Sequence, residues 1–306
     1  MTEQYSTNWK DALIQARNGL LDRITGVKPD QVLNAAPYQP SQTESIDLAA
    51  ELKMAMDEFK IAAMDEDGYQ VNYARLRESK AYAEYRDFCA PRLRFFDPAA
   101  LSGRDESLAF WINLYNALVL DGIINFSVQN SVTEGRLGVL AFFCKAAYDV
   151  GGLPVNLEDI EHGILRTNRG HPYIPGPQFA SNDPRLDWVI SEPDVRIHFA
   201  LNCASRSCPP IRAYTAERIN TQLDLAGRGF VDTNIRIDQD KSELHTSAIF
   251  NWYKIDFGGK EGVIDFIIKH LPDDERRTWI QDNQGTLKLR DDPYNWGLNL
   301  WVDNQG

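Results

Sequence analysis

Apolar residues recur at steps of three and four positions along the first third of the chain, a spacing typical of amphipathic helices. The clearest run, over residues 43–63, has its apolar side chains at Ile46, Ala49, Leu52, Met56 and Phe59. Residues 79–90 predict a second helix that ends before Pro91. Residues 106–126 are apolar on almost every face, which predicts a helix buried on most sides.

Short apolar or alternating runs between turn residues predict extended segments in the second half of the chain. We expect these segments at 146–150, 153–157, 196–203, 235–237, 245–252, 286–289 and 296–301. Helices are expected between them at 158–166, 215–233 and 262–270. The loop at 167–187 is long enough to be a lid or binding loop. This order predicts an α+β domain over residues 65–306, preceded by a helical N-terminal extension over residues 1–64.

The charge and composition exclude several classes of protein. The 306 residues are 43% hydrophobic, which excludes a wholly disordered chain, and they carry a net charge of −12. Such an acidic chain argues against nucleic acid or an anionic membrane as the partner, because phosphate contacts need clustered basic residues. The first residues lack the basic and apolar regions of a secretory signal, and the long apolar stretches are interrupted by polar residues. We therefore expect a cytoplasmic protein without a membrane span.

The cysteine pattern gives no metal site. Of Cys89, Cys144, Cys203 and Cys208, only the last two are close in sequence, and zinc sites usually have tighter pairs matched by a second pair or by histidines. The acidic turn at 65–68 resembles the start of a calcium loop, but the position of the bidentate glutamate holds a leucine. We expect no metal and no cofactor.

Four segments, in this order, resemble the DUF547 family, a domain of unknown function. They read AFWINLYNA at 109–117, DIEHGILR at 159–166, HFALNCASRSCPP at 198–210 and YNWGLN at 294–299. The resemblance covers residue 60 to the C-terminus. It implies a fold like that of papain- and transglutaminase-like cysteine hydrolases, with a buried central helix packed against a mainly antiparallel sheet.

The resemblance also implies site residues. The matching positions are Cys203 and His162, with Glu161 and Arg166 in the same segment as the histidine. The family usually has glycine after its first cysteine, where this chain has Ala204.

The residues around Cys203 suit nucleophilic catalysis. A thiol attacks as the thiolate, so a catalytic cysteine needs a nearby base or positive field. Cys203 follows an expected strand and enters a polar turn, where the Asn202 amide and the N–H groups of Ala204 and Ser205 are candidate oxyanion donors. Arg206 adds positive charge. The alternative is that Cys203 is a small buried apolar residue.

Two histidines compete for the role of base. Alternation along a strand at 196–203 places His198 on the face opposite Cys203, which favours His162 as the general base. His198 and Arg166 then belong to the substrate-binding wall, together with Arg206. Asn113 and Asn116 of the buried helix are further candidates for this wall, or they tie down loops. The orienting partner of His162 stays open: Glu161, its neighbour on a helix, should point elsewhere, whereas Asp159 and Arg166 share its face. Asp159 could accept an imidazole N–H or could cap the helix.

These residues predict a cysteine-dependent hydrolase or acyl transferase that acts on a peptide or a small amide or thioester. Cys203 is the predicted nucleophile, with His162, Asn202 and Glu161 around it. The alternative is a non-catalytic interaction domain with a degenerate hydrolase-like fold. A third hypothesis is redox chemistry through Cys203 and Cys208.

Overall fold

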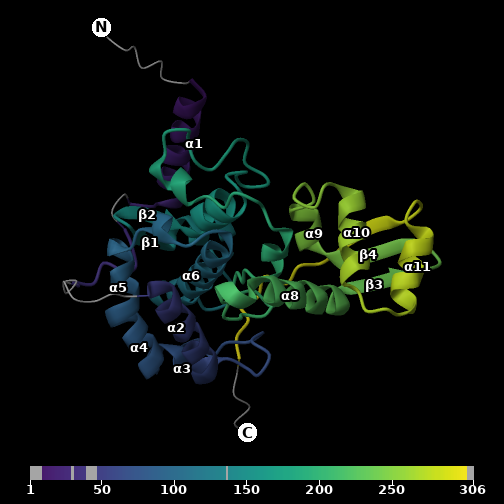
Figure 1. The fold of residues 1–306 in the computed structure, drawn as a ribbon, viewed down its shortest axis with the longest axis horizontal. Helices are drawn as coiled ribbons and strands as arrows, with labels where there is room; N and C mark the ends of the chain where they lie inside the picture. Colours follow the sequence, from purple (N-terminus) through teal and green to yellow (C-terminus); the bar gives the residue numbers. More distant parts are fainter. Residues whose placement is uncertain (1–8, 29–30, 39–46, 136, 302–306) are drawn as a thin grey trace.

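The computed structural model describes residues 9–28, 31–38, 47–135 and 137–301. It is a mixed α+β structure with about 53% helix and small sheets, which confirms the expected fold class at this level. Figure 1 shows a larger lobe that contains the N-terminal helices and a smaller lobe that contains α9, α10, α11 and the second sheet. Helix α8 (Ile219–Thr233) extends from one lobe to the other.

The larger lobe is built mainly from helices. In chain order they are α1 (Trp9–Thr25), α2 (Leu48–Ala63), α3 (Tyr73–Glu78), α4 (Lys80–Glu84), η1 (Tyr85–Cys89), α5 (Ala90–Arg92), η2 (Leu93–Phe95), η3 (Pro98–Ala100), α6 (Arg104–Asn125) and α7 (Val139–Lys145). The helix predicted over 43–63 is α2, which Asp47 caps by accepting the N–H of Ala50. Positions 43–46 of that prediction lie outside the described residues.

Helix α6 is the buried centre of this lobe, as predicted. Every residue from Leu108 to Ile124 is buried. Although α6 is long and apolar enough to cross a membrane, 94% of its most apolar stretch is buried inside the protein, as in the core helix of a globular protein. Its main neighbours are α2, α3, α8 and η4 (Asp159–Leu165). The expectation that it packs against a sheet is wrong, because the apolar faces of other helices cover it.

A two-stranded antiparallel hairpin leads to the first site element. Strands β1 (Ala147–Val150) and β2 (Leu153–Asn156) pair as predicted. Gly151 forms the turn at φ +59°, and a side chain there would lie 2.9 Å from the carbonyl oxygen of Phe96. The short π-helix η4 follows, where the sequence predicts a helix.

The strand predicted at 196–203 is absent. The chain instead forms the 3-10 helices η5 (Pro184–Trp188) and η6 (Val195–Phe199). Asp194 caps η6 by accepting the N–H of Arg196 at 3.1 Å, and the two side chains also form an ion pair. This local capping overrides the alternating pattern. Because the strand is absent, the prediction that His198 and Cys203 lie on opposite faces of a strand no longer applies.

The smaller lobe has a mixed sheet. The short helix η7 (Ala216–Arg218) packs against α6 and leads into α8. After α8 the elements of the smaller lobe are β3 (Ile235–Asp238), β4 (Glu243–Ser247), α9 (Ala248–Trp252), α10 (Lys260–His270), α11 (Glu275–Asn283) and β5 (Lys288–Asp292). Strands β3 and β4 are antiparallel, with Ile235 opposite Thr246, whereas β4 and β5 are parallel, with Glu243 opposite Lys288. The sheet is therefore not mainly antiparallel. Of the segment predicted at 245–252, the first three residues belong to β4 and the rest form α9, because Ser247 caps that helix.

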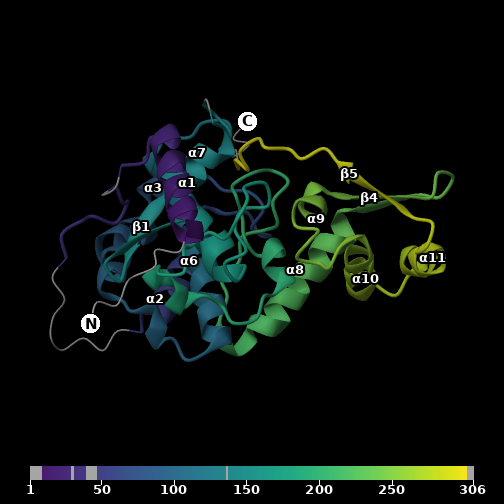
Figure 2. The same cartoon turned by 90° about the horizontal axis from the view of Figure 1, so that it is seen from above.

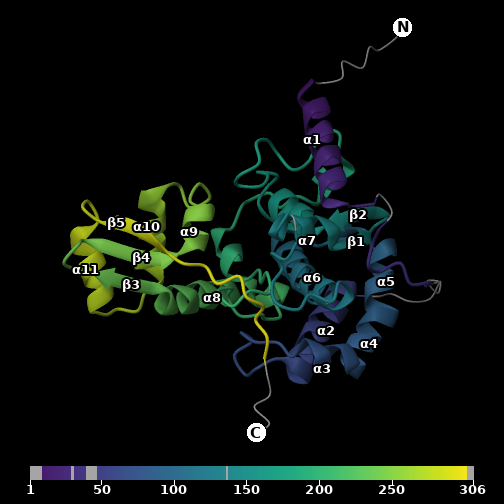
Figure 3. The ribbon, with the colours of Figure 1, turned by 180° about the vertical axis from the view of Figure 1, so that it is seen from behind.

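Each lobe has its own apolar core. The segment after β5 connects the two lobes. The second core gathers the rings of Phe199, Phe230, Phe250 and Phe266. After β5 the chain returns to the larger lobe, as Figures 2 and 3 show. There the predicted strand at 296–301 is replaced by isolated bridges, such as Leu300 with Val71.

Candidate functional site

A cavity of about 210 Å³ is lined by residues of both lobes, among them four of the nine predicted site residues, Cys203, His162, Glu161 and His198. Its ionisable and thiol-bearing residues are Glu158, Glu161, His162, His171, His198, Cys203 and Cys208, besides four tyrosines. The other walls are aromatic and aliphatic: Val139, Phe143, Pro172, Leu201, Ile249, Trp252 and Trp296. The site therefore combines acids, bases and thiols with apolar surface, as substrate pockets of enzymes do.

The two thiols meet at the hydroxyl of Tyr294. Its oxygen lies 3.4 Å from Sγ of Cys203 and 3.2 Å from Sγ of Cys208. The hydroxyl of Ser205 lies 3.4 Å from the first sulfur and 3.3 Å from the second, and it donates to Tyr294 at 2.9 Å. Both thiols are free, with Cys203 partly exposed and Cys208 buried.

The hydrogen bonds favour charge on Cys208. Its sulfur accepts the backbone N–H of Cys203 at 3.0 Å. Burial opposes ionisation, but hydrogen bonds from Cys203, Ser205 and Tyr294 outweigh it and lower the pKa of Cys208 to about 7. The hydrogen bond with Cys208, together with burial, raises the pKa of Cys203 well above its ordinary value. Thus the pair holds its first negative charge near neutral pH, and the second only at much higher pH.

Asparagine side chains of α6 hold the thiol loop in place. Asn116 donates to the carbonyl of Ala200 at 3.0 Å and accepts the N–H of Asn202 at 2.9 Å. Asn113 donates to the carbonyl of Tyr214 at 2.8 Å and accepts the N–H of the same residue at 2.9 Å. Neither side chain lines the cavity, so the prediction that they form its wall is corrected. They tie down loops, which is the other alternative that the sequence left open.

Two of the three predicted oxyanion donors, the Asn202 amide and the N–H of Ala204, are already used inside the turn. Asn202 donates to the carbonyl of Pro209 at 2.5 Å and accepts the N–H of Ala204 at 2.7 Å. Ala204 adopts φ +63°, a left-handed conformation that explains why glycine suits this position. The chain therefore keeps the turn with alanine, and neither Asn202 nor the N–H of Ala204 is free for a substrate.

His162 is held by an arginine and not by a thiol. Its Nδ1 lies 3.0 Å from Nη1 of Arg166, and its Nε2 lies 3.6 Å from Glu158. Arginine always donates, so Nδ1 is the acceptor and Nε2 carries the proton of the neutral ring. Burial, together with Arg166, lowers the pKa of His162 well below its ordinary value. Among the described residues no hydrogen bond joins this ring to Cys203, and the predicted pairing of the two is not present.

His198 has the arrangement expected of an oriented base. Its Nε2 lies 3.0 Å from Asp256, and its ring stacks on Tyr253 at 3.8 Å between centroids. Its Nδ1 is buried and has no hydrogen-bond partner among the described residues. Burial lowers the pKa of His198, whereas Asp256 acts in the opposite direction. Hydrogen bonds from His198 and Arg166 outweigh the effect of burial on Asp256 and lower its pKa, so the carboxylate stays ionised.

Glu161, in η4, and Glu158, the residue before η4, differ in their partners. Glu161 accepts hydrogen bonds from Tyr115, at 3.0 Å, and from Tyr253. It lies 4.0 Å from His162, too far to orient that ring by a hydrogen bond. The pKa of Glu158 is raised to about 8 by burial and by the neighbouring carboxylates of Glu161 and Asp159.

The two predicted arginines lie outside the cavity lining. Arg166 is one layer behind it, where it forms a buried ion pair with Asp256 at 2.6 Å and donates to the carbonyl of Gly170 at 2.6 Å. Arg206 is exposed and its Nε approaches the carbonyl of Leu298 at 3.3 Å. The expectation that Arg206 supplies positive charge to the thiol is wrong, because its side chain turns toward the C-terminal segment.

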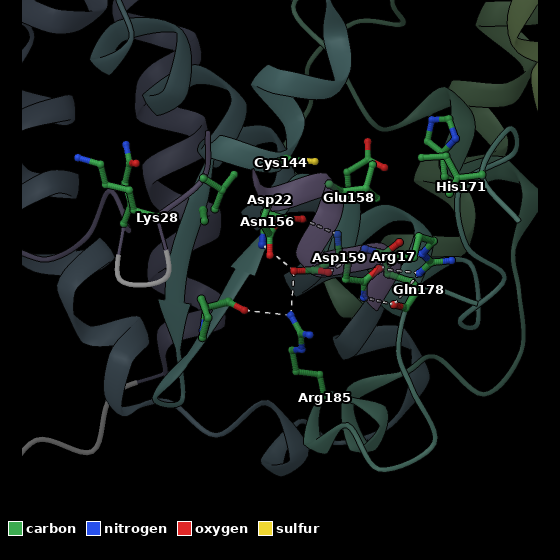
Figure 4. A pocket seen from close by; sticks show the side chains of 17 residues that line it. Arg17, Asp22, Lys28, Cys144, Asn156, Glu158, Asp159, His171, Gln178 and Arg185 are labelled. Carbon is green, nitrogen blue, oxygen red and sulfur yellow. Dashed lines mark hydrogen bonds and ion pairs between the residues drawn. The ribbon is translucent and has the colours of Figure 1, made fainter. Parts of the chain in front are cut away.

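The loop predicted as a lid contributes His171, Pro172 and Tyr173 to the cavity lining. Helix α1 holds this loop: Arg17 donates to the carbonyl of Pro175 at 2.8 Å and to that of Pro177 at 2.7 Å. A second cavity of about 190 Å³ lies between this loop, α1 and the β1–β2 hairpin. Figure 4 shows it, with Arg185 pointing toward Asp159, which it contacts at 2.9 Å.

Glu158, His162 and His171 bring three potential metal ligands within 4.8 Å of one another. The tautomer argues against a metal there, because the Nε2 of His162 carries the proton while Nδ1 accepts from Arg166.

Sequence reasoning missed Trp252, the last residue of α9, and Tyr253 and Asp256, which follow α9. No motif marks them. Tyr294, which contacts both thiols, lies in the fourth resembling segment, YNWGLN, and that segment was the available signal.

A family model described as "Protein of unknown function, DUF547" matches residues 98–231. The match includes α6, His162, His198 and the thiol loop, but it ends before Asp256 and Tyr294. No solved structure matches the chain.

Proposed function

The chain carries a DUF547 domain, and from its cavity we propose that it is a cysteine-dependent hydrolase or acyl transferase for a small amide or thioester. Cys203 is the nucleophile in this proposal, because it is the more exposed of the two thiols. His198 replaces His162 as the general base. A relation to papain- and transglutaminase-like enzymes is part of the proposal, supported by this set of thiol, imidazole and carboxylate.

One observation carries the proposal. His198 hydrogen-bonds Asp256 through Nε2, has a buried Nδ1 without a hydrogen-bond partner among the described residues, and lines a cavity that both thiols also line. A buried polar atom without a partner costs free energy, and a catalytic role is one reason why a folded protein keeps such an atom. An imidazole that a carboxylate orients in this way is the usual activator of a thiol or hydroxyl nucleophile.

The residues divide the reaction as follows. Sγ of Cys203 attacks the substrate carbonyl carbon while its proton passes to Nδ1 of His198. The Nε2–H of His162, fixed by Arg166, is available to stabilise the developing oxyanion. The proton then moves from His198 to the leaving amine or thiol, and water or an acceptor nucleophile cleaves the acyl-thioester and restores the thiol.

Acylation by 4-nitrophenyl butyrate tests the proposal. We expect one butyryl group on the peptide that contains Cys203, detected by mass spectrometry, and none in Cys203→Ala. His198→Gln should slow acylation by about 100-fold or more. His245→Gln, on β4 and outside the cavity, is the matched control, and thermal unfolding shows whether each variant is folded. Equal acylation of the His198 and His245 variants, or butyryl on other residues, contradicts the proposal.

The close thiols favour one second candidate, a dithiol–disulfide couple. In that reaction Cys203 and Cys208 would lose two protons and two electrons to a substrate disulfide, which becomes two thiols. A mass loss of two hydrogens on treatment with oxidised glutathione, with one internal bond between these cysteines, would favour it over acyl transfer.

A further inference from the structure

The charges of the cavity are one-sided. Its described lining contains two carboxyl side chains, Glu158 and Glu161, and neither lysine nor arginine. Two of its histidines are buried with lowered pKa values, and His171 has a pKa of about 4, so all three are neutral at pH 7. An anionic ligand would therefore meet no compensating charge in the cavity, whereas a cation would.

The nearest arginine does not change this balance. Arg166 lies behind the lining, where its guanidinium is paired with Asp256 at 2.6 Å. It also lies over the ring of Tyr253, at 5.0 Å from the centroid. The positive charge of Arg166 is thus neutralised by Asp256, outside the cavity lining.

Of the two glutamates, Glu158 is the one left for a ligand. Both oxygens of Glu161 accept phenolic hydrogen bonds, from Tyr115 and Tyr253. Nε2 of His162 lies 3.6 Å from the Glu158 carboxyl, which is beyond hydrogen-bond distance, and among the described residues this carboxyl has no hydrogen-bond partner. Glu158 is buried and lines both cavities, so it lies at the boundary between them.

Aromatic rings surround the rest of the space. Trp252 and Trp296 stack at 5.4 Å, and Tyr294 lies 4.7 Å from each of them. Aromatic faces attract ammonium groups and also bury the apolar part of a ligand.

We propose that the cavity binds a ligand with a protonated primary amine, which Glu158 pairs with while the apolar part of the ligand lies against Trp252 and Trp296. The inference rests on the proposed function only in taking this cavity as the site, and it adds the class of substrate. A peptide N-terminus and a lysine side chain both carry this group.

Electrostatics makes the binding depend on pH. Because the pKa of Glu158 is about 8, its carboxyl is mostly protonated at pH 6.5 and mostly ionised at pH 9. An alkylamine with a pKa near that of lysine, about 10, stays charged over this range. Amine binding should therefore tighten as the pH rises. The ionisable groups that face Glu158 are Asp22, Cys144, Asp159, Glu161, His162, Arg166, His171 and Tyr253.

The test compares 2-phenylethylamine with 2-phenylethanol, which differ only in the amine. Binding is measured by calorimetry on the full chain with Cys203→Ala, so that neither turnover nor the nucleophile enters the result. We expect the amine to bind at least tenfold more tightly than the alcohol at pH 9, and its affinity to fall about tenfold or more at pH 6.5. In Glu158→Gln the preference disappears, while the exposed Glu217→Gln, the matched control, keeps it.

L-phenylalaninamide and Nα-acetyl-L-lysinamide, compared at pH 8, then distinguish the two sources of the amine. Only the second presents it on a lysine side chain, and an α-amine, with a pKa of about 8, would be mostly neutral at pH 9. Equal binding of amine and alcohol, or no binding of either, overturns the inference whatever the acylation experiment gives. If Glu158→Gln does not fold, the pH dependence of amine binding in the full chain with Cys203→Ala and Cys208→Ala decides, because the Cys208 thiol also ionises near pH 7. Lack of acylation with a retained amine preference overturns the proposed function and leaves this inference standing.

Discussion

Nη1 of Arg166 donates to Nδ1 of His162 at 3.0 Å, and this one contact fixes what the histidine can do. A ring that accepts from arginine at Nδ1 carries its proton at Nε2 and cannot take another without losing that bond. His162 is therefore a donor toward the cavity, whereas His198, oriented by Asp256, has the free acceptor nitrogen.

The tautomer of His162 is directly measurable. We expect ¹⁵N shifts of the ring to show protonated Nε2 and unprotonated Nδ1 at pH 7, and the same neutral form at pH 5, because burial, together with Arg166, lowers its pKa well below 6.5. The measurement is a long-range ¹H–¹⁵N correlation spectrum, with the signal assigned by His162→Gln. An imidazolium at pH 5 would contradict the assignment.

The thiols should react as a coupled pair. Alkylation by iodoacetamide, followed by peptide mapping, should show a first inflection near pH 7 and no second one below pH 10, since the pKa of Cys208 is about 7 and that of Cys203 is raised. Tyr294→Phe removes a hydroxyl that contacts both sulfurs and should move the inflection up by about one unit. Tyr173→Phe, at an exposed position of the same cavity, should leave it unchanged. A single inflection near the ordinary cysteine value would show that the thiols do not interact.

His171 should make the protein less stable in acid. Its pKa is about 4 when folded and about 6.5 when unfolded, so the unfolded chain binds the extra proton and stability falls as the pH drops from 6.5 toward 4. His171→Asn can keep the bond with the N–H of Tyr173 and removes this titration. Urea unfolding should then show a slope against pH that is smaller by about 1.4 kcal/mol per pH unit at pH 5. Parallel slopes for the two proteins would refute the shift.

Gly163 marks the tightest packing of η4. A methyl group there would lie 2.3 Å from the ring of Phe179, which is fully buried. We expect Gly163→Ala to lower the free energy of unfolding by about 1–3 kcal/mol. Gly229→Ala is the control, because it lies exposed on α8 with open space around it and should stabilise by about 1 kcal/mol. Chemical denaturation measures both, and an unchanged Gly163→Ala variant would show that Phe179 moves freely.

The helices could be predicted because their signals are local. The apolar run of α6 and the spacing of α2 each specify a buried face without help from distant residues. The strand expected at 196–203 failed for a local reason too, since the cap at Asp194 and its ion pair with Arg196 set the backbone of η6.

The site could be predicted only in part, because its decisive partners are distant in sequence. Cys203, His162, Glu161 and His198 line one cavity, as sequence patterns indicated. The choice between the histidines depended on Asp256, which lies 58 residues after His198 and belongs to no recognisable motif. Its position follows from the packing of the smaller lobe.

The return of the C-terminal segment also sets the order in which the cavity can be completed during synthesis. Tyr294 and Trp296 are translated after every other residue of its lining, and the Tyr294 hydroxyl contacts both sulfurs. A nascent chain therefore has both thiols and all three cavity histidines before this phenol leaves the ribosome. Until then Ser205 is the hydroxyl available to both sulfurs, and the segment after β5 does not yet connect the two lobes.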